Sequence, residues 1–309
     1  MAASNQETLF PDEPAIAPQP GQPSANVWNK DNAKGALDEL FSLTFQYKTS
    51  KAYEDLLKFV GRFGFYSPFN AMLVHMQMPG AQYVAPPYRW LHDYERKIKP
   101  GARPLVILKP MGPVMFVFDV SDTEGKPLPP EIEKPFEVRQ GSAGDSLRKT
   151  IENSKRDGVA IHTAKMGSQQ GGSIRVAESS AKTIAFKETF IPVRYQIELD
   201  QAASEQSRYA SLAHELAHLY CGHLGTPNDR WWPDRRGLSH AVCELEAESV
   251  AYMVCTRLGI DNPSEQYLAG YIQDQEHIPP ISLECVMKTA GLIEKMGKEN
   301  LVHRKEKTE

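Results

Sequence analysis

The chain has 309 residues, of which 41% are hydrophobic and 24% are charged; these proportions exclude a chain that is disordered throughout and indicate one or two globular domains. A net charge of −4 at pH 7 excludes a protein that binds polyanions over its whole surface, although a local basic patch is compatible with it. No apolar run approaches the ~20 residues of a membrane-spanning helix, so no membrane association is expected.

The N-terminal part predicts a tail, then helices, then a β-hairpin. Residues 1–26 are rich in Pro, Ala and Gln without a hydrophobic period, which predicts a disordered tail, and they lack the basic start and apolar core of a secretory signal. Apolar residues at helical spacing predict three helices, which begin near Asn32, near Lys51 and after Pro68. Two β-rich runs at 104–110 and 114–120 predict the hairpin.

The C-terminal part predicts a small sheet flanked by helices. Four prolines between Gly125 and Pro135 predict an interdomain linker over 126–135. A helix follows, with Asp145 as its N-cap and Gly158 as its stop, and another begins near Ser204. Strands are predicted at 159–164, 173–178 and 194–199. The expected fold class is therefore α+β, with an N-terminal domain over 27–125, a C-terminal domain over 136–300 and a charged tail over 301–309.

The segment HELAH at 214–218 predicts a metal site. On a helix, His214 and His218 lie one turn apart on the same face, so both imidazoles can reach one Zn²⁺ at ~2.0–2.1 Å. Glu215 stands beside the first histidine, where a carboxylate can deprotonate a water molecule without binding the metal. Chance would produce this pattern in about one chain in a hundred of this length.

A catalytic zinc ion needs a third protein ligand and one open position. The metzincin pattern is excluded, because Cys221 and Leu224 stand where it requires Gly and His. Glu244 and Glu248 share one face of the next predicted helix, so we expect Glu244 to be the third ligand and Glu248 to hydrogen-bond a ligand histidine. Glu246 lies about 200° round the axis from Glu244 and is expected on a solvated face.

Five other residues near the motif have open roles. Cys221 can compete as a thiolate ligand, but a buried free cysteine more often acts as a small apolar residue. His223 and His240 are weaker candidates for electrophilic helpers or neighbours of the metal, since each of them is more often an ordinary polar residue. Trp232, with Trp231, either lines a cleft or caps the core.

Four cysteines in so long a chain form no disulfide framework, which fits a reducing compartment and predicts a cytoplasmic protein.

HELAHLYCGH at 214–223, followed by ELEAESVAY at 244–252, resembles the ImmA/IrrE-type metallopeptidases. Those proteins are gluzincin-like, with HExxH on one helix and a glutamate from a following helix completing the zinc site. The resemblance implies a zincin-like domain that hydrolyses peptide bonds. The second motif of that family often has Asn or Asp where this chain has Glu248, whose side chain is longer.

The upstream sequence resembles the N-terminal domain of ArdC-type antirestriction proteins, which is associated with binding single-stranded DNA. The matching stretches are YSPFNAMLVHMQMPGA (66–81), Trp90, RKIKPG (96–101) and FDVSDTEG (118–125). Together the two resemblances cover about residues 30–275 in the same domain order. They imply an antirestriction or mobile-element role and three alternatives: a zinc peptidase, a protein that shields single-stranded DNA while its zinc domain is structural or regulatory, and a regulator that cleaves one repressor.

The DNA-binding prediction can also be read from the residues. Cations at Arg96, Lys97 and Lys99 are interleaved with aromatic side chains such as Trp90. Cations that track phosphates and aromatic faces that stack on bases are the requirements of single-strand binding. The alternative is that Trp90 and the neighbouring tyrosines are core residues and the lysines merely solvate a loop.

Overall fold

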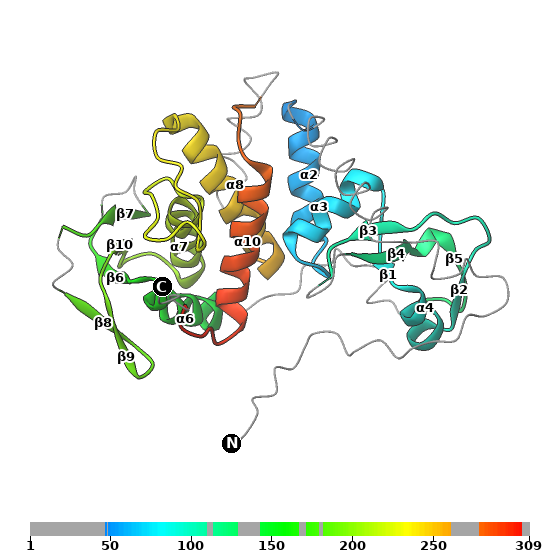
Figure 1. Cartoon of the computed structure of the whole chain (residues 1–309), viewed down its shortest axis with the longest axis horizontal. Helices are drawn as coiled ribbons and strands as arrows, with labels where there is room; N and C mark the ends of the chain where they lie inside the picture. Colours follow the sequence, from blue (N-terminus) through cyan, green and yellow to red (C-terminus); the bar gives the residue numbers. More distant parts are fainter. Residues whose placement is uncertain are drawn as a thin grey trace.

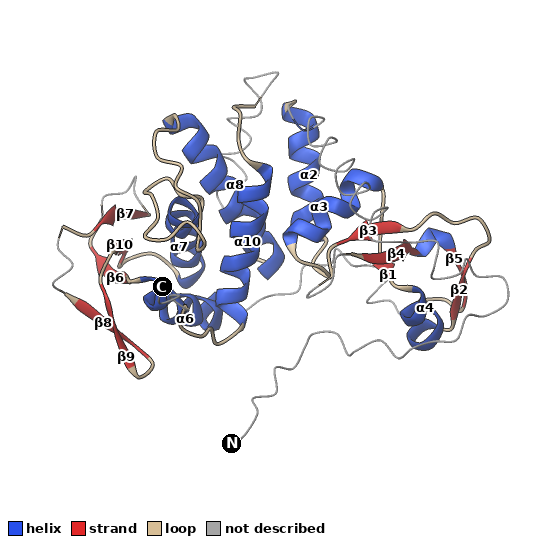
Figure 2. Ribbon diagram, in the orientation of Figure 1, coloured by secondary structure: helices blue, strands red, loops and turns tan. Residues whose placement is uncertain are grey.

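The computed structural model describes residues 47, 49–109, 114–128, 143–166, 171–178, 182–260 and 278–304. The predicted tail at 1–26 and the helix predicted from Asn32 lie outside these residues, as do most of the predicted linker and residues 305–309. The described residues form seven α-helices and several small sheets, so the predicted α+β class is confirmed (Figures 1 and 2). None of the described helices is long and apolar enough to cross a bilayer.

The N-terminal elements are two helices followed by small antiparallel sheets. Thr49 and Ser67 cap the first two helices with their hydroxyl groups, and the predicted hairpin is the pair β3–β4. The sheets are β1–β4–β3 and β2–β5, and helix α4 was not expected from the sequence. The elements are α2 (Ser50–Arg62), α3 (Pro68–Gln77), β1 (Val84–Ala85), α4 (Pro87–Tyr94), β2 (Arg96–Ile98), β3 (Leu105–Ile107), β4 (Met115–Asp119) and β5 (Thr123–Gly125).

The C-terminal elements are a three-stranded sheet, a separate hairpin and four helices. Strand β10 is the centre of the sheet, parallel to β6 and antiparallel to β7, and α7 packs against it. The three predicted strands and the helix predicted to begin near Ser204 are confirmed, whereas the hairpin β8–β9 was missed; Ser204 is the N-cap of that helix. The elements are α6 (Ala143–Ser154), β6 (Val159–Ala164), β7 (Gly172–Val176), β8 (Thr183–Phe186), β9 (Thr189–Pro192), β10 (Tyr195–Asp200), α7 (Glu205–Tyr220), α8 (His240–Leu258) and α10 (Leu283–Lys298).

The N-cap predicted for α6 was wrong, and the predicted end of this helical segment at Gly158 was right. Asp145 lies in the first turn of α6, which already begins at Ala143, so it is not the N-cap, although a negative charge in this turn still favours the helix. Gly158 has a φ of 79°, the left-handed conformation that lets the chain leave the helical segment and enter β6.

Helices α2 and α3 share one hydrophobic core with α7, α8 and α10; α2 packs against α8, and α3 packs against α10 (Figure 1). The buried hydroxyl of Tyr53 on α2 donates to the hydroxyl of Ser249 on α8 at 2.7 Å. Arg257 of α8 donates to the carbonyls of Val60 and Phe63 at the end of α2, at 3.0 and 2.8 Å. The N-terminal helices therefore support the helix that carries the predicted third ligand.

Candidate metal centre

Helix α7 presents the two histidines because its other face is apolar. Leu212, Leu216 and Leu219 are fully buried, and their side chains hold this face of α7 in the core. His214 and His218 consequently point away from those leucines, one turn apart, towards α8. The side chains of both histidines are 14–19% exposed, so the site is reachable from solvent.

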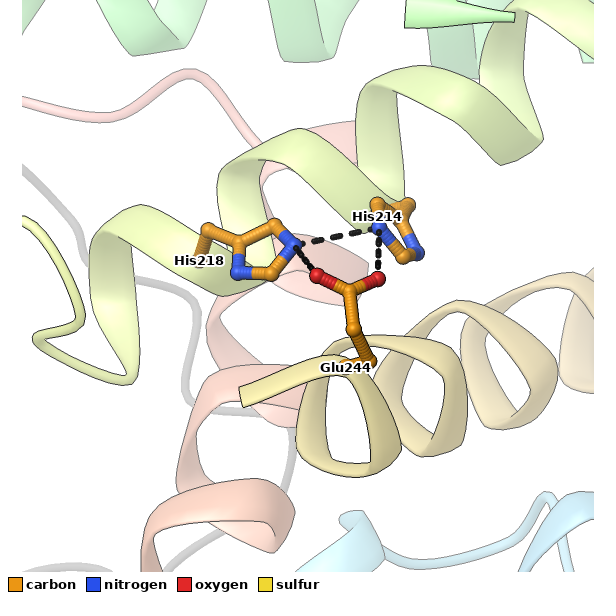
Figure 3. A group of neighbouring side chains, drawn as sticks. All are labelled: His214, His218 and Glu244. Atoms are coloured by element: carbon orange, nitrogen blue, oxygen red, sulfur yellow. Dashed lines mark hydrogen bonds and ion pairs between the residues drawn. The ribbon is translucent and has the colours of Figure 1, made fainter. Parts of the chain in front are cut away.

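Three donor atoms converge between α7 and α8, as Figure 3 shows. The Nε2 atoms of His214 and His218 are 3.1 Å apart. Oε2 of Glu244 lies 3.6 Å from His214 Nε2, and Oε1 of the same carboxylate lies 3.5 Å from His218 Nε2. Donors bound tetrahedrally at 2.0–2.1 Å from one ion are separated by about 3.3 Å, so these three fit a zinc ion in spacing and in chemistry.

The close approach of α8 depends on small side chains. Ala247 and Ala251, on the Glu244 face of α8, are fully buried, and α8 packs against α7. Glu248, one turn beyond Glu244, has its Oε1 3.3 Å from His214 Nδ1. The structure thus brings together all four residues that the sequence singled out around the metal, namely His214, His218, Glu244 and Glu248.

The two histidines carry opposite pKa shifts. Burial lowers the pKa of His214, but Glu244 and Glu248 outweigh it and raise the pKa to about 10. Burial and the neighbouring His214 lower the pKa of His218 to about 4. The pair therefore favours a protonated His214 beside a neutral His218 when no metal is bound.

Glu215 lies beside this group, in a position suited to proton transfer. Its side chain is almost fully buried, and burial raises the pKa of its carboxyl to about 7. The backbone N–H of Ile174 on strand β7 donates a hydrogen bond to that carboxylate. A Cβ at Gly172 would lie 3.2 Å from Glu215 Cγ and Oε1, so a glycine leaves room for the carboxylate.

Glu246 was expected on a solvated face, and this prediction was wrong. Glu246 is completely buried, because the loop before α8 and the start of α10 cover that side of the helix. Arg235 donates to its two oxygens at 2.6 and 2.7 Å, and the backbone N–H of Ser282 donates at 2.7 Å. His223 Nε2 lies 2.9 Å from Glu246 Oε2. A glutamate is buried here because its charge is fully paired.

A second group of possible metal donors does not fit an ion. Donor atoms of Cys221, His223 and Glu246 lie within 4.8 Å of one another. Both oxygens of Glu246 are occupied by the Arg235 guanidinium, which would repel a cation. The pKa of the Cys221 thiol is raised by its hydrogen bond with Cys285 and by burial, so the group stays a neutral thiol. Cys221 accordingly behaves as a small buried residue.

Two other open roles are decided by burial. His240 is 87% exposed, and its Nδ1 lies 3.4 Å from Glu244 Oε1, so it touches the outer edge of the metal centre. Trp232 is buried, and its indole N–H donates to the carbonyl of Gly225 at 2.9 Å, so it caps the core. The sequence offered no signal for Arg235, whose role depends on a loop that crosses over α8.

The predicted DNA-contact residues do not form a stacking site. Trp90 is completely buried, and its indole N–H donates to the Phe118 carbonyl, so its ring cannot receive a base and that part of the prediction was wrong. Arg96 is used internally, since its guanidinium donates to the side chain and the carbonyl of Thr123. Lys97 and Lys99 are exposed on and just after β2.

The fold and the site define a zincin-like domain, in which an HExxH helix and a glutamate-bearing helix flank a small sheet. Residues 155–258, which span β6 to α8, match the model of the IrrE N-terminal-like domain, Peptidase_M78. The family that this segment matches is the one that the sequence resemblance named.

Two further comparisons accompany this match. The crystal structure of the antirestriction protein ArdC from the R388 plasmid, in its Mn(II)-bound form, is 17% identical to this chain. The similarity covers 75% of this chain and 86% of that chain with a TM-score of 0.33, a value at which it supports no statement about function. No curated protein matches the chain.

Proposed function

We propose that the chain is a zinc-dependent endopeptidase of the ImmA/IrrE type that acts on a protein or peptide substrate in the cytoplasm. The observation that carries this proposal is the convergence of His214, His218 and Glu244, with Glu215 beside them. A bound zinc ion would supply Lewis acidity, polarising the scissile carbonyl and lowering the pKa of water. Four free cysteines among the described residues fit a reducing compartment.

The chain's own residues supply the proton transfers. Burial brings the pKa of Glu215 near neutrality, where a carboxylate can both take a proton and return it. Glu215 would accept the proton of the attacking water and then deliver it to the amine that leaves the cleaved peptide bond. The Ile174 N–H holds the carboxylate in place, and Glu248 holds the ring of His214.

The substitution Glu215→Gln tests this assignment. The variant keeps the shape of the side chain and all three proposed ligands, so we expect it to retain zinc while losing cleavage of a mixed peptide library read by mass spectrometry. Metal analysis of the wild type, His214→Ala and Glu244→Ala tests the ligand set, with loss of zinc expected in both variants. Cleavage at the wild-type rate by zinc-loaded Glu215→Gln would refute the role of Glu215 as general base.

A second candidate function is single-stranded DNA binding by residues 27–125. The exposed side chains of Lys97, Lys99 and Arg103 favour it, although the Lys99 ammonium also donates to the Ser121 carbonyl at 2.8 Å. Since Trp90 cannot stack on a base, the contact would be made to phosphates, and affinity would fall steeply with salt. This function is compatible with the peptidase and with cleavage of one repressor.

The DNA candidate is tested by measuring affinity for a labelled oligonucleotide against salt concentration. We expect the double variant Lys97→Ala/Lys99→Ala to bind more weakly and with a slope smaller by about 1–2 in log–log form, because two phosphate contacts are lost. Lys288→Ala/Lys295→Ala removes two exposed charges from α10 and is the matched control. Equal affinities and slopes for the two double variants would exclude a phosphate site at Lys97 and Lys99.

A further inference from the structure

A continuous hydrogen-bonded series leads from Arg235 to the back of the metal centre. Arg235 donates to Glu246 from both of its terminal nitrogens, Nη1 and Nη2, and Glu246 Oε2 lies 2.9 Å from His223 Nε2. The other ring nitrogen of His223, Nδ1, lies 2.9 Å from Nδ1 of His218. The Nε2 atom of His218, on the opposite side of its ring, faces the metal centre.

The direction of these hydrogen bonds is determined at Glu246. The guanidinium of Arg235 and the backbone N–H of Ser282 can only donate, and together they engage both carboxylate oxygens. An ionised carboxylate only accepts, so His223 carries its hydrogen on Nε2. A neutral imidazole has one N–H, which leaves Nδ1 of His223 as an acceptor. His218 must then donate from Nδ1, and its Nε2 has no hydrogen.

The backbone brings His223 into this position. Gly222 has a φ of 83°, and a Cβ on it would lie 2.0 Å from the carbonyl oxygen of Pro233, so only glycine fits. The reversal of the chain at Gly222 lets the His223 N–H donate to the His218 carbonyl at 3.0 Å. It also places the two rings 5.1 Å apart. The Gly-His pair after HExxH thereby turns a histidine back onto the second ligand.

We propose that His223 is a positioning residue that holds His218 in the tautomer able to bind metal through Nε2. The inference rests on the proposed zinc site and deepens it. His214 receives the same support directly from a carboxylate, because its Nδ1 lies 3.3 Å from Glu248. His218 has no such direct contact with Glu246; His223 lies between them, accepts the hydrogen of His218 Nδ1 and donates its own hydrogen to Glu246.

The first test is zinc affinity, measured on the full chain by competition with a chromophoric chelator. His223→Leu fills the space but neither accepts nor donates, and we expect zinc to bind about 10–100-fold more weakly. His223→Gln should recover most of the affinity, because its amide oxygen can accept from His218 and its NH₂ can donate to Glu246. His162→Leu removes an exposed histidine from β6 and serves as the control. Wild-type affinity in His223→Leu, or an equal loss in His223→Gln, would overturn the proposal.

The second test reads the tautomers directly and does not require the variants to fold. In protein labelled with ¹⁵N-histidine, two-bond ¹H–¹⁵N correlations show which ring nitrogen carries hydrogen. We expect His223 to be protonated on Nε2 alone and His218 on Nδ1 alone, both in metal-free and in zinc-loaded protein. Hydrogen on Nδ1 of His223 refutes the inference. The proposed function is refuted by different results, namely wild-type protein that binds no zinc or zinc-loaded protein that cleaves no peptide.

Discussion

Two glutamates two residues apart on α8 should respond to mutation in opposite ways. Glu246 is completely buried and accepts hydrogen bonds from Arg235, His223 and Ser282, so Glu246→Ala leaves a largely buried guanidinium without its partner. Loss of one member of a buried ion pair costs about 3–5 kcal/mol of unfolding free energy. The side chain of Glu244 is 24% exposed and, among the described residues, forms its ion pairs with histidines, which can lose their proton when the carboxylate is removed, so in metal-free protein its removal should cost less than that of Glu246.

The assay is urea unfolding of wild type, Glu246→Ala and Glu244→Ala in the presence of a chelator, so that bound zinc adds nothing to stability. At an unchanged m-value, the midpoint should fall markedly for Glu246→Ala and less for Glu244→Ala. Zinc affinity should instead fall more for Glu244→Ala than for Glu246→Ala, because of these two glutamates Glu244 alone supplies a donor atom to the proposed site. The reasoning is refuted if Glu246→Ala unfolds within about 0.5 kcal/mol of the wild type, the range of ordinary surface substitutions.

Three more predictions follow from the same geometry. Gly172→Ala should displace the Glu215 carboxylate and lower kcat at unchanged zinc content, whereas Gly64→Ala, which meets nothing within 4 Å, should leave kcat as in the wild type. Free zinc at a thousandfold excess over its Kd should stabilise the wild type by about 4 kcal/mol and His214→Ala hardly at all, as read from midpoints with and without chelator. Burial would raise the pKa of Glu246, but hydrogen bonds from His223 and Arg235 outweigh it and lower the pKa. The contribution of Glu246 to the unfolding free energy is therefore complete above the unfolded pKa of about 4.3 and is lost as pH falls through the folded pKa. Unfolding free energy measured against pH should show this loss in the wild type and not in Glu246→Gln.

The local elements of this protein could be predicted where neighbouring residues in the sequence decide them. The helix α7 with its start near Ser204, the strands β6, β7 and β10, and the stop at Gly158 depend on periodicity and on single residues with strong conformational preferences. The shared face of His214 and His218 follows from the 100° rotation per residue of a helix. The same arithmetic put Glu244 and Glu248 on one face, and the structure brings that face to the two histidines.

Periodicity gives the direction in which a side chain leaves its helix but says nothing about what lies there. Glu246 was expected in solvent because its direction differs from that of Glu244, yet Arg235 and the start of α10 cover it. Trp90 was expected to contact bases because cations surround it in sequence, but α4 turns its ring into a small core with Tyr83 and Leu128. Burial depends on a partner surface that folding supplies from distant parts of the chain.

The sequence by itself therefore determined the donor types and their spacing along each helix, since both are properties of short segments. Only the tertiary structure decided how α7 and α8 approach, that α2 and α3 join the core behind them, and that His223 turns back onto His218. These features arise from long-range packing, in which Ala247, Ala251 and Gly222 matter because they leave space for other parts of the chain.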